Sequence, residues 1–219
     1  KQGVDQDVLE EFEKQVKKIE TLGHTVHDIE LPHIKYSLPT YYILMPAEAS
    51  TNLARFDGVR YGFHKDGDNS IDDFKQSRGS GFGMEVRRRI MIGTYVLSSG
   101  YYDTYYGRAL SARKMIGEDF DKAYESVDII ATPTTPTPAF KIGEKEDPLS
   151  MYIADVLTVP ASITGNTALS LPMGMVRRAG VELPVGLQLI ASNFSDRKIF
   201  ALGKQLENRF TLPNFSQQS

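Results

Sequence analysis

Three short runs of aliphatic and β-branched residues constrain the fold of this chain more than any other feature. The runs are VDIIATPT (127–134), ALSLPMG (168–174) and LPVGLQLIA (183–191), and proline or glycine bounds each of them. Continuous apolar runs of this length are typical of strands that are covered on both faces. Together with the helical patterns elsewhere in the chain, they predict an α/β fold, in which a mixed β-sheet is flanked by α-helices.

Helical periodicity accounts for much of the remaining chain. Apolar residues recur every three or four positions from Asp7 to Leu22, and Gly23 is placed to end that helix. Four more helices are expected at 41–55, 84–99, 104–126 and 195–210.

Two further segments carry weaker patterns. Val26 and Ile29, with short polar neighbours, predict a strand at 24–31. The stretch 56–80 is rich in glycine, aspartate and serine, which favours loop structure with a short helix near 71–76.

Composition excludes several classes of function. The 219 residues include no cysteine, so disulfides, thiolate nucleophiles and cysteine-ligated metals are excluded. The formal net charge of -3 provides no overall positive field for nucleic acid. No membrane span or signal peptide is evident, so a cytoplasmic protein is expected. Because the chain opens at Lys1 in helical pattern, we expect residues 1–219 to be part of a longer single domain.

The sequence RRRIMIGTYVLSSGYY (87–102) places three arginines against an otherwise apolar helix. Successive residues of an α-helix are about 100° apart, which places Arg89 in the same apolar sector as Gly93. Arg87 and Arg88 fall on the opposite, solvent-facing side. A guanidinium that faces inward stays charged and therefore requires a fixed anion or several hydrogen-bond acceptors.

Two interpretations of this arginine remain open. Arg89 either forms a structural ion pair with a carboxylate of another element, or it binds a ligand carboxylate through two parallel hydrogen bonds. Asp155, which lies in the apolar sequence MYIADVLTVPASITG (151–165), has similar alternatives. It is a helix N-terminal carboxylate, a partner for an arginine, or the acceptor for a ligand ammonium group. In the ligand interpretation, Arg89 and Asp155 would hold the two ends of an α-amino acid.

Other motifs carry weaker functional signals. His24 and His27 would point to opposite faces of the expected strand, so no metal site is assigned. GSGFG (79–83) lacks the lysine and hydroxyl residue that end a phosphate-binding loop. Five tyrosines near Gly100 are expected to pack two helices together, with a nucleic-acid surface as the alternative. They are Tyr95, Tyr101, Tyr102, Tyr105 and Tyr106.

Long segments of this chain resemble one family of enzymes. From near Lys1 to about Phe210, the chain resembles the C-terminal half of the A subunits of glutamyl-tRNA(Gln) amidotransferases, which are amidase-signature enzymes. The resemblance implies the amidase-signature fold. The segments that carry it are YYILMPAEASTNLARFDGVRYG (41–62), EVRRRIMIGTYVLSSGYYDTYY (85–106), DPLSMYIADVLTVPASITGNTALSLPMG (147–174) and LPVGLQLIA (183–191).

The resemblance also implies a reaction and a set of partners. In that family the A subunit releases ammonia from glutamine. A B subunit, which uses ATP and Mg, employs the ammonia to convert glutamate misacylated on tRNA(Gln) to glutamine, and a small C subunit lies at their interface. The implied assembly is a heterotrimer that meets charged tRNA through the complex. No cofactor and no membrane are implied for this chain itself.

The resemblance assigns substrate-binding residues but no catalytic ones. It places the glutamine-carboxylate arginine on Arg89, the amine-binding aspartate on Asp155 and a substrate-site tyrosine on Tyr41. The family's serine nucleophile, bridging serine and lysine base accompany a Gly/Ser-rich segment, and no run like GGSSGGS occurs here. We therefore expect the isolated chain to be inactive, with the nucleophile in an N-terminal half outside it. Two alternatives are a stand-alone amidase for small amides and a non-catalytic binding or assembly module.

Overall fold

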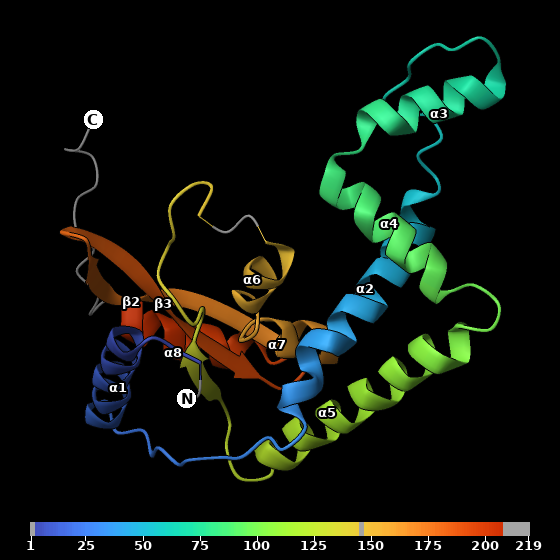
Figure 1. Ribbon diagram of the computed structural model, residues 1–219. Helices are drawn as coiled ribbons and strands as arrows, with labels where there is room; N and C mark the ends of the chain where they lie inside the picture. Colours follow the sequence, from blue (N-terminus) through green and yellow to red (C-terminus); the bar gives the residue numbers. More distant parts are fainter. Residues whose placement is uncertain (1–2, 145–146, 208–219) are drawn as a thin grey trace. The chain divides into compact units, whose positions relative to one another are not determined.

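The structure, a computed structural model, describes residues 3–144 and 147–207 (Figure 1). The chain divides into two compact units. One combines Lys1–Leu38 with Lys114–Ser219, and the other is Pro39–Arg113. The first unit contains the β-sheet, and the second consists of helices and the loops that join them.

The sheet of the first unit has three antiparallel strands (Figure 1). β3 (Val181–Ala191) lies in the middle, with β1 (Ile130–Pro133) on one side and β2 (Thr167–Arg178) on the other. The three strands fall on the three apolar runs, so these sequence predictions are confirmed. Ala179 and Gly180 connect β2 to β3 with φ angles of 48° and 85°. Two successive positive φ angles are typical of the tight turn that joins antiparallel strands.

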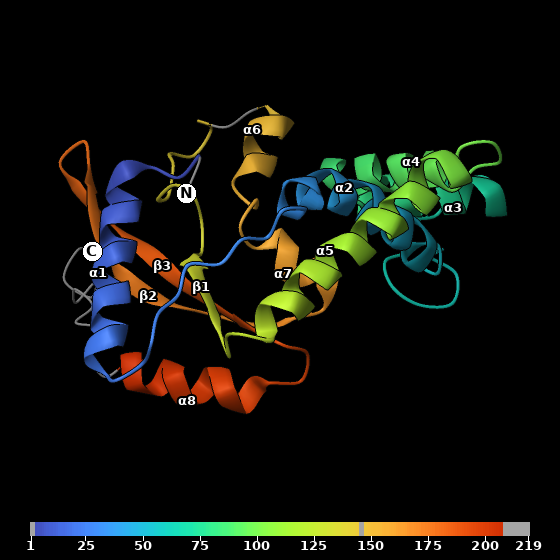
Figure 2. The ribbon, with the colours of Figure 1, turned by 90° about the horizontal axis from the view of Figure 1, so that it is seen from below.

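Helices cover both faces of this sheet. On one face, α1 (Gln6–Thr21) and α8 (Asp196–Glu207) enclose a hydrophobic core (Figure 2). On the other face, the Gln188 side chain donates a 2.8 Å hydrogen bond from Nε2 to the Leu157 carbonyl, just before α7 (Val159–Thr164). The predicted α/β class with flanking helices is therefore confirmed, whereas the sheet within the described residues is antiparallel and not mixed. The core includes Val8, Ile19, Val185, Leu187, Leu189, Ile199, Leu202 and Leu206.

The second unit is organised around two helices that approach closely. A Cβ atom on Gly93 would overlap the backbone carbonyl of Pro46 and would lie 2.7 Å from the Ser50 hydroxyl. Glycine is therefore the residue that allows the helices to cross here.

The remaining elements of the chain are mostly helical. In chain order they are η1 (Ile34–Tyr36), α2 (Ser37–Leu53), α3 (Ser70–Gly81), α4 (Met84–Val96), the π-helix η2 (Tyr102–Gly107), α5 (Arg108–Tyr124) and α6 (Pro148–Ile153).

The strand predicted at 24–31 is wrong. The segment forms neither strand nor helix, and within the described chain the backbone N–H groups of 25–31 donate no hydrogen bond. A strand exists only with a partner, and the local sequence pattern does not reveal whether a partner is present.

Other differences from the sequence predictions concern helix limits. α3 is longer than the short helix expected at 71–76, because the Asn69 side chain caps it by accepting from Ile71 N and Asp72 N at 3.1 Å. The helix expected from 104 instead begins as a π-helix. The last helix is confirmed as far as Glu207, and 208–210 lie outside the described residues.

Gly93→Ala is expected to destabilise the protein by about 1–3 kcal/mol, because the added methyl group forces α4 away from α2. Urea unfolding measures the change. Gly117→Ala in α5 is the matched control, since a Cβ there meets nothing within 4 Å and alanine favours helix. Equal stability of the Gly93→Ala variant and the control would contradict the close helix crossing.

Candidate functional site

Arg89 lies on the inner face of α4. Its side chain is 30% exposed, compared with 40% for Arg88, and Arg87 is exposed. Gly93 and Val96, which continue the same face of the helix, are buried. The helical periodicity therefore identified the innermost arginine correctly. It was wrong about Arg88, which is half-buried rather than solvent-facing.

The carboxylate partner of Arg89 lies on the same helix. Glu85 accepts a hydrogen bond from Arg89 Nε at 3.0 Å and another from Arg88 Nη1 at 2.7 Å. Arg89 Nη1 also lies 3.8 Å from the Met45 sulfur atom on α2. Among the described residues, no carboxylate of another element pairs with Arg89, and Nη2 makes no hydrogen bond. The structural interpretation predicted an ion pair between Arg89 and a carboxylate of another element. The described residues do not form such a pair.

Tyr41 lies close to this arginine. It is half-buried on α2, one helical turn before Met45, and its ring meets Tyr42 edge-on at 5.0 Å. Partial burial acts to lower the pKa of Arg89. The hydrogen bond and charge of Glu85 outweigh it, with contributions from Tyr41 and Tyr42, so the pKa is raised. The group therefore remains a cation, and the structure brings Tyr41 and Arg89 to one face of the α2–α4 pair.

Asp155 lies in the turn between α6 and α7, in the other compact unit. Its backbone carbonyl accepts hydrogen bonds from Val159 N at 3.0 Å and the Thr158 hydroxyl at 3.1 Å. Its carboxylate is exposed and makes no hydrogen bond or ion pair with the residues that the structure describes. The side chain thus does not cap α7, and the pairing of Asp155 with Arg89 around one ligand stays a prediction.

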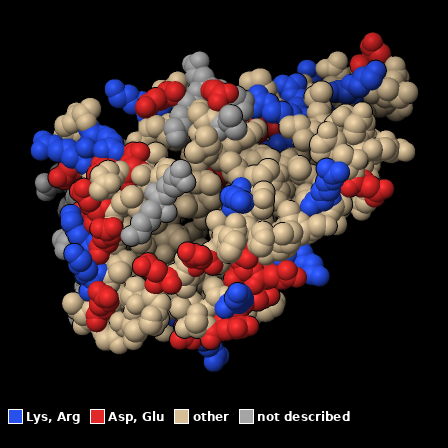
Figure 3. All heavy atoms as spheres, turned by 60° about the horizontal axis from the view of Figure 1, so that its bottom comes forward, with Lys and Arg blue, Asp and Glu red and all other residues tan. Residues whose placement is uncertain are grey.

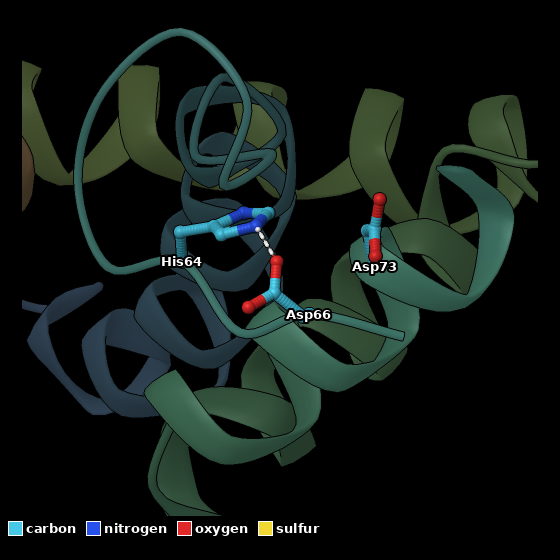
Figure 4. Close-up of side chains that lie close together, drawn as sticks. All are labelled: His64, Asp66 and Asp73. Atoms are coloured by element: carbon cyan, nitrogen blue, oxygen red, sulfur yellow. Dashed lines mark hydrogen bonds and ion pairs between the residues drawn. The ribbon is translucent and has the colours of Figure 1, made fainter. Parts of the chain in front are cut away.

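Sequence reasoning missed one cluster of ionisable side chains. His64, Asp66 and Asp73 each offer one atom, and these atoms lie within 4.8 Å of one another (Figure 4). His64 Nδ1 is 2.6 Å from the carbonyl oxygen of Gly58, and Nε2 is 3.0 Å from Asp66 Oδ1. Both neighbours are acceptors, so these contacts favour the imidazolium form, in which both ring nitrogens carry hydrogen. The available signal was an aspartate two residues after a histidine in an acidic loop.

The same contacts account for the cluster without a bound ion. The hydrogen bond to Asp66, followed by that to Gly58, raises the pKa of His64. Asp73 accepts from Gly67 N at 2.6 Å, so its carboxylate is also engaged. His64 and Asp66 are exposed, and we assign no metal to this cluster.

His24, which the sequence analysis considered as a metal ligand, is also exposed. Its Nε2 atom lies 3.3 Å from Gln205 Oε1.

The packing prediction for the tyrosines near Gly100 is confirmed in part, because three of the five meet between α4 and η2, whereas Tyr102 and Tyr106 contact each other within η2. The rings of Tyr95, Tyr101 and Tyr105 have centroids 4.4 to 6.3 Å apart. The hydrogen bond to Tyr101, together with partial burial, raises the pKa of Tyr95 to about 12. Gly100 has a φ of 86°, which allows the chain to turn between the two helices.

Figure 3 draws the charged side chains on one face of the molecule. Basic and acidic side chains are interspersed on the face drawn in Figure 3. This distribution agrees with the formal net charge of -3. A helix with the length and apolarity needed to cross a bilayer does not occur in the described residues.

Asp66→Asn is expected to lower the pKa of His64, because the ring loses the carboxylate that most stabilises its charged form. The folded-state pKa is raised, so the contact stabilises the fold below the unfolded pKa of histidine. That stability is lost as pH rises through the folded pKa. NMR titration of the His64 ring measures the shift. Asp68→Asn is the matched control, since Asp68 bonds Asp72 through its backbone N–H. An unchanged titration in Asp66→Asn would refute the imidazolium assignment.

Comparison with known proteins identifies the family. The family described as Amidase matches residues 1–200. The A subunit of the Pelagibacter ubique glutamyl-tRNA(Gln) amidotransferase is 48% identical over 213 residues, which are 97% of this chain and 43% of that protein. The A subunit of the Halalkalibacterium halodurans enzyme of the same name is 50% identical over 208 residues, covering 94% of this chain and 42% of the relative.

A solved structure agrees with these sequence matches. The A subunit of the glutamyl-tRNA(Gln) amidotransferase from Thermotoga maritima superposes with a TM-score of 0.69 at 38% identity, over 97% of this chain and 41% of that one. The present chain thus spans less than half the length of these relatives. The matched stretch includes the sheet and the positions of Tyr41, Arg89 and Asp155. The chain belongs to the amidase family.

Proposed function

We propose that this chain is the glutamine-holding part of an ammonia-releasing A subunit in a tRNA-dependent amidotransferase. The observation that carries the proposal is the inward-facing Arg89 beside Tyr41. Identities of 48–50% to A subunits of glutamyl-tRNA(Gln) amidotransferases support the same assignment.

In this proposal Arg89 binds the α-carboxylate of glutamine. Glu85 holds Nε at 3.0 Å and so fixes the plane of the guanidinium group. The opposite edge, formed by Nη1 and Nη2, then faces the ligand and donates two parallel hydrogen bonds to its carboxylate. The Met45 sulfur atom, a weak acceptor at 3.8 Å, is readily replaced by a carboxylate oxygen.

The other two site residues complete the recognition of the amino acid. The Asp155 carboxylate, which has no partner among the described residues, accepts from the ligand ammonium group. Tyr41, on the neighbouring helix α2, supplies a phenolic hydroxyl to the same ligand. In this proposal each charge of the zwitterionic ligand meets an opposite charge.

The chemical step is assigned to residues outside this chain. In amide hydrolysis an activated hydroxyl attacks the carboxamide carbon, backbone donors stabilise the oxyanion, and ammonia leaves. We assign no catalytic residue in this chain, so the isolated chain is expected to be inactive. The proposed partners are the B and C subunits of the amidotransferase in a cytoplasmic heterotrimer. ATP and Mg are used by the B subunit, and charged tRNA is reached through the complex.

Arg89→Ala in the whole subunit is expected to reduce kcat/KM for glutamine by about 100-fold. Two charge-assisted hydrogen bonds are lost, at about 1.5 kcal/mol each. Arg89→Lys is expected to recover part of the loss, because an ammonium retains the charge but not the planar pair of donors. Ammonia release at varied glutamine concentration measures these effects.

Arg88→Ala is the matched control, since Arg88 contacts the same Glu85 from a more exposed position. Unchanged glutamine kinetics in Arg89→Ala would remove the ligand role of Arg89. Hydrolysis of simple amides without tRNA-dependent amidation would favour the stand-alone amidase instead. If no complex with B and C subunits forms and no amide is hydrolysed, both of these functions are wrong.

A further inference from the structure

A buried side-chain amide lies in the middle of the central strand. Gln188 stands between Leu187 and Leu189 on β3 and is 4% exposed. Both leucines belong to the core that α1 and α8 enclose, so the Gln188 side chain points to the opposite face of the sheet. A buried amide destabilises a fold unless its polar atoms are hydrogen-bonded. The contacts of this side chain therefore indicate why it is tolerated here.

The Gln188 amide joins the sheet to a segment outside it. Nε2 donates a hydrogen bond to the Leu157 carbonyl at 2.8 Å and another to the Thr132 hydroxyl oxygen at 3.0 Å. Thr132 lies directly opposite Gln188 in the register of β1 and β3, so this second bond lies within the sheet. Leu157 belongs to the turn 154–158, which joins α6 to α7 (Figure 1). A carboxamide nitrogen carries two hydrogens, so both donors of Gln188 are used.

The Leu157 carbonyl depends on this side chain for a hydrogen bond. In a helical turn, that carbonyl would accept from the backbone N–H of residue 160 or 161. Pro160 has no N–H, and among the described residues no backbone N–H donates to the Leu157 carbonyl. No other hydrogen bond connects 154–158 with a strand in the described part of the chain. Gln188 is therefore the residue that attaches this turn to the sheet by a hydrogen bond.

Asp155 lies in the same turn, two residues before Leu157. Its backbone carbonyl accepts hydrogen bonds from Thr158 N and Val159 N, both at 3.0 Å, so Leu157 lies inside a loop that is closed by backbone bonds. A shift of Leu157 would therefore move Asp155 with it. The Asp155 carboxylate makes no hydrogen bond or ion pair with the described residues. The attachment of its backbone is thus what places this carboxylate within its unit.

We infer that Gln188 is a positioning residue for glutamine binding. It holds the Leu157 carbonyl and thereby places the Asp155 carboxylate, which accepts from the ammonium group of the ligand. The inference rests on the proposed function, which gives Asp155 that role. Gln188 acts on the ligand only through Asp155, so its loss is expected to weaken glutamine binding more than it slows the hydrolytic step.

Gln188→Met in the whole subunit tests the inference, because methionine has a similar length but no donor. The Michaelis constant for glutamine is expected to rise about 10-fold, with kcat within about 3-fold of wild type. Ammonia release at varied glutamine concentration measures both constants.

Thr132→Val is the matched control, because it removes the other acceptor of Gln188 Nε2 and leaves the bond to Leu157. Its KM is expected to stay within about 2-fold of wild type. A rise in KM as large as that of Gln188→Met would overturn the inference, as would an unchanged KM in Gln188→Met.

A double-mutant cycle with Asp155→Asn separates positioning from general structural support. If Gln188 acts through Asp155, Gln188→Met raises KM about 10-fold in the wild-type background and less than about 2-fold in the Asp155→Asn background. Equal factors in the two backgrounds would show that Gln188 acts independently of Asp155 and would contradict the inference.

A second variant covers the case in which Gln188→Met does not fold. Gln188→Asn keeps an amide on this face of β3, but it is one methylene group shorter and cannot keep the 2.8 Å bond to the Leu157 carbonyl. The same rise in KM is expected, and thermal unfolding shows whether each variant is folded. Failure of both variants to fold would assign Gln188 to stability alone and overturn the positioning role.

The inference and the proposed function fail in different ways. An unchanged KM for glutamine in Asp155→Asn would contradict the ammonium-binding role of Asp155, and the inference about Gln188 with it. A raised KM in Asp155→Asn together with a wild-type KM in Gln188→Met would leave the proposed function intact and refute the inference alone.

Discussion

The central strand β3 is the constraint on which the sheet unit depends. Leu187 and Leu189 are fully buried in the core that α1 and α8 enclose, whereas Gln188 points to the opposite face and bonds the Leu157 carbonyl. A slip of one residue would exchange these faces, burying an amide in the apolar core and removing the bond to the turn before α7. Because that turn carries Asp155, the register of β3 also determines where this carboxylate lies within its unit.

In the helical unit, Gly93 is a comparable constraint, because it has no side chain. Gly93 allows α4 to approach the backbone of α2 at Pro46. Arg89, one turn earlier on α4, is thereby held near Met45 and Tyr41. The position of the guanidinium thus follows from the packing of the two helix backbones at Gly93.

The features that the sequence predicted are those governed by local periodicity. The three strands followed from apolar runs, and the inward arginine followed from the angle between helical residues. The segment 24–31 could not be predicted correctly, because a strand requires a partner and pairing depends on tertiary structure. The His64 cluster was missed for a related reason, since its contacts join loop residues to Gly58 and α3. Arg88 was misplaced because its bond to Glu85 draws it toward the helix surface.

The bond between Arg89 and Glu85 has a consequence for preorganisation. Its counter-ion lies on the same helix, so the ion pair does not depend on how another element packs against α4. In the proposed binding mode, a ligand carboxylate displaces only the weak contact with the Met45 sulfur atom, and the ion pair stays in place. The proposed ligand would then cost little rotamer entropy at Arg89, so more of the interaction energy would appear as affinity. α4 thus carries both the guanidinium of Arg89 and the carboxylate that orients it.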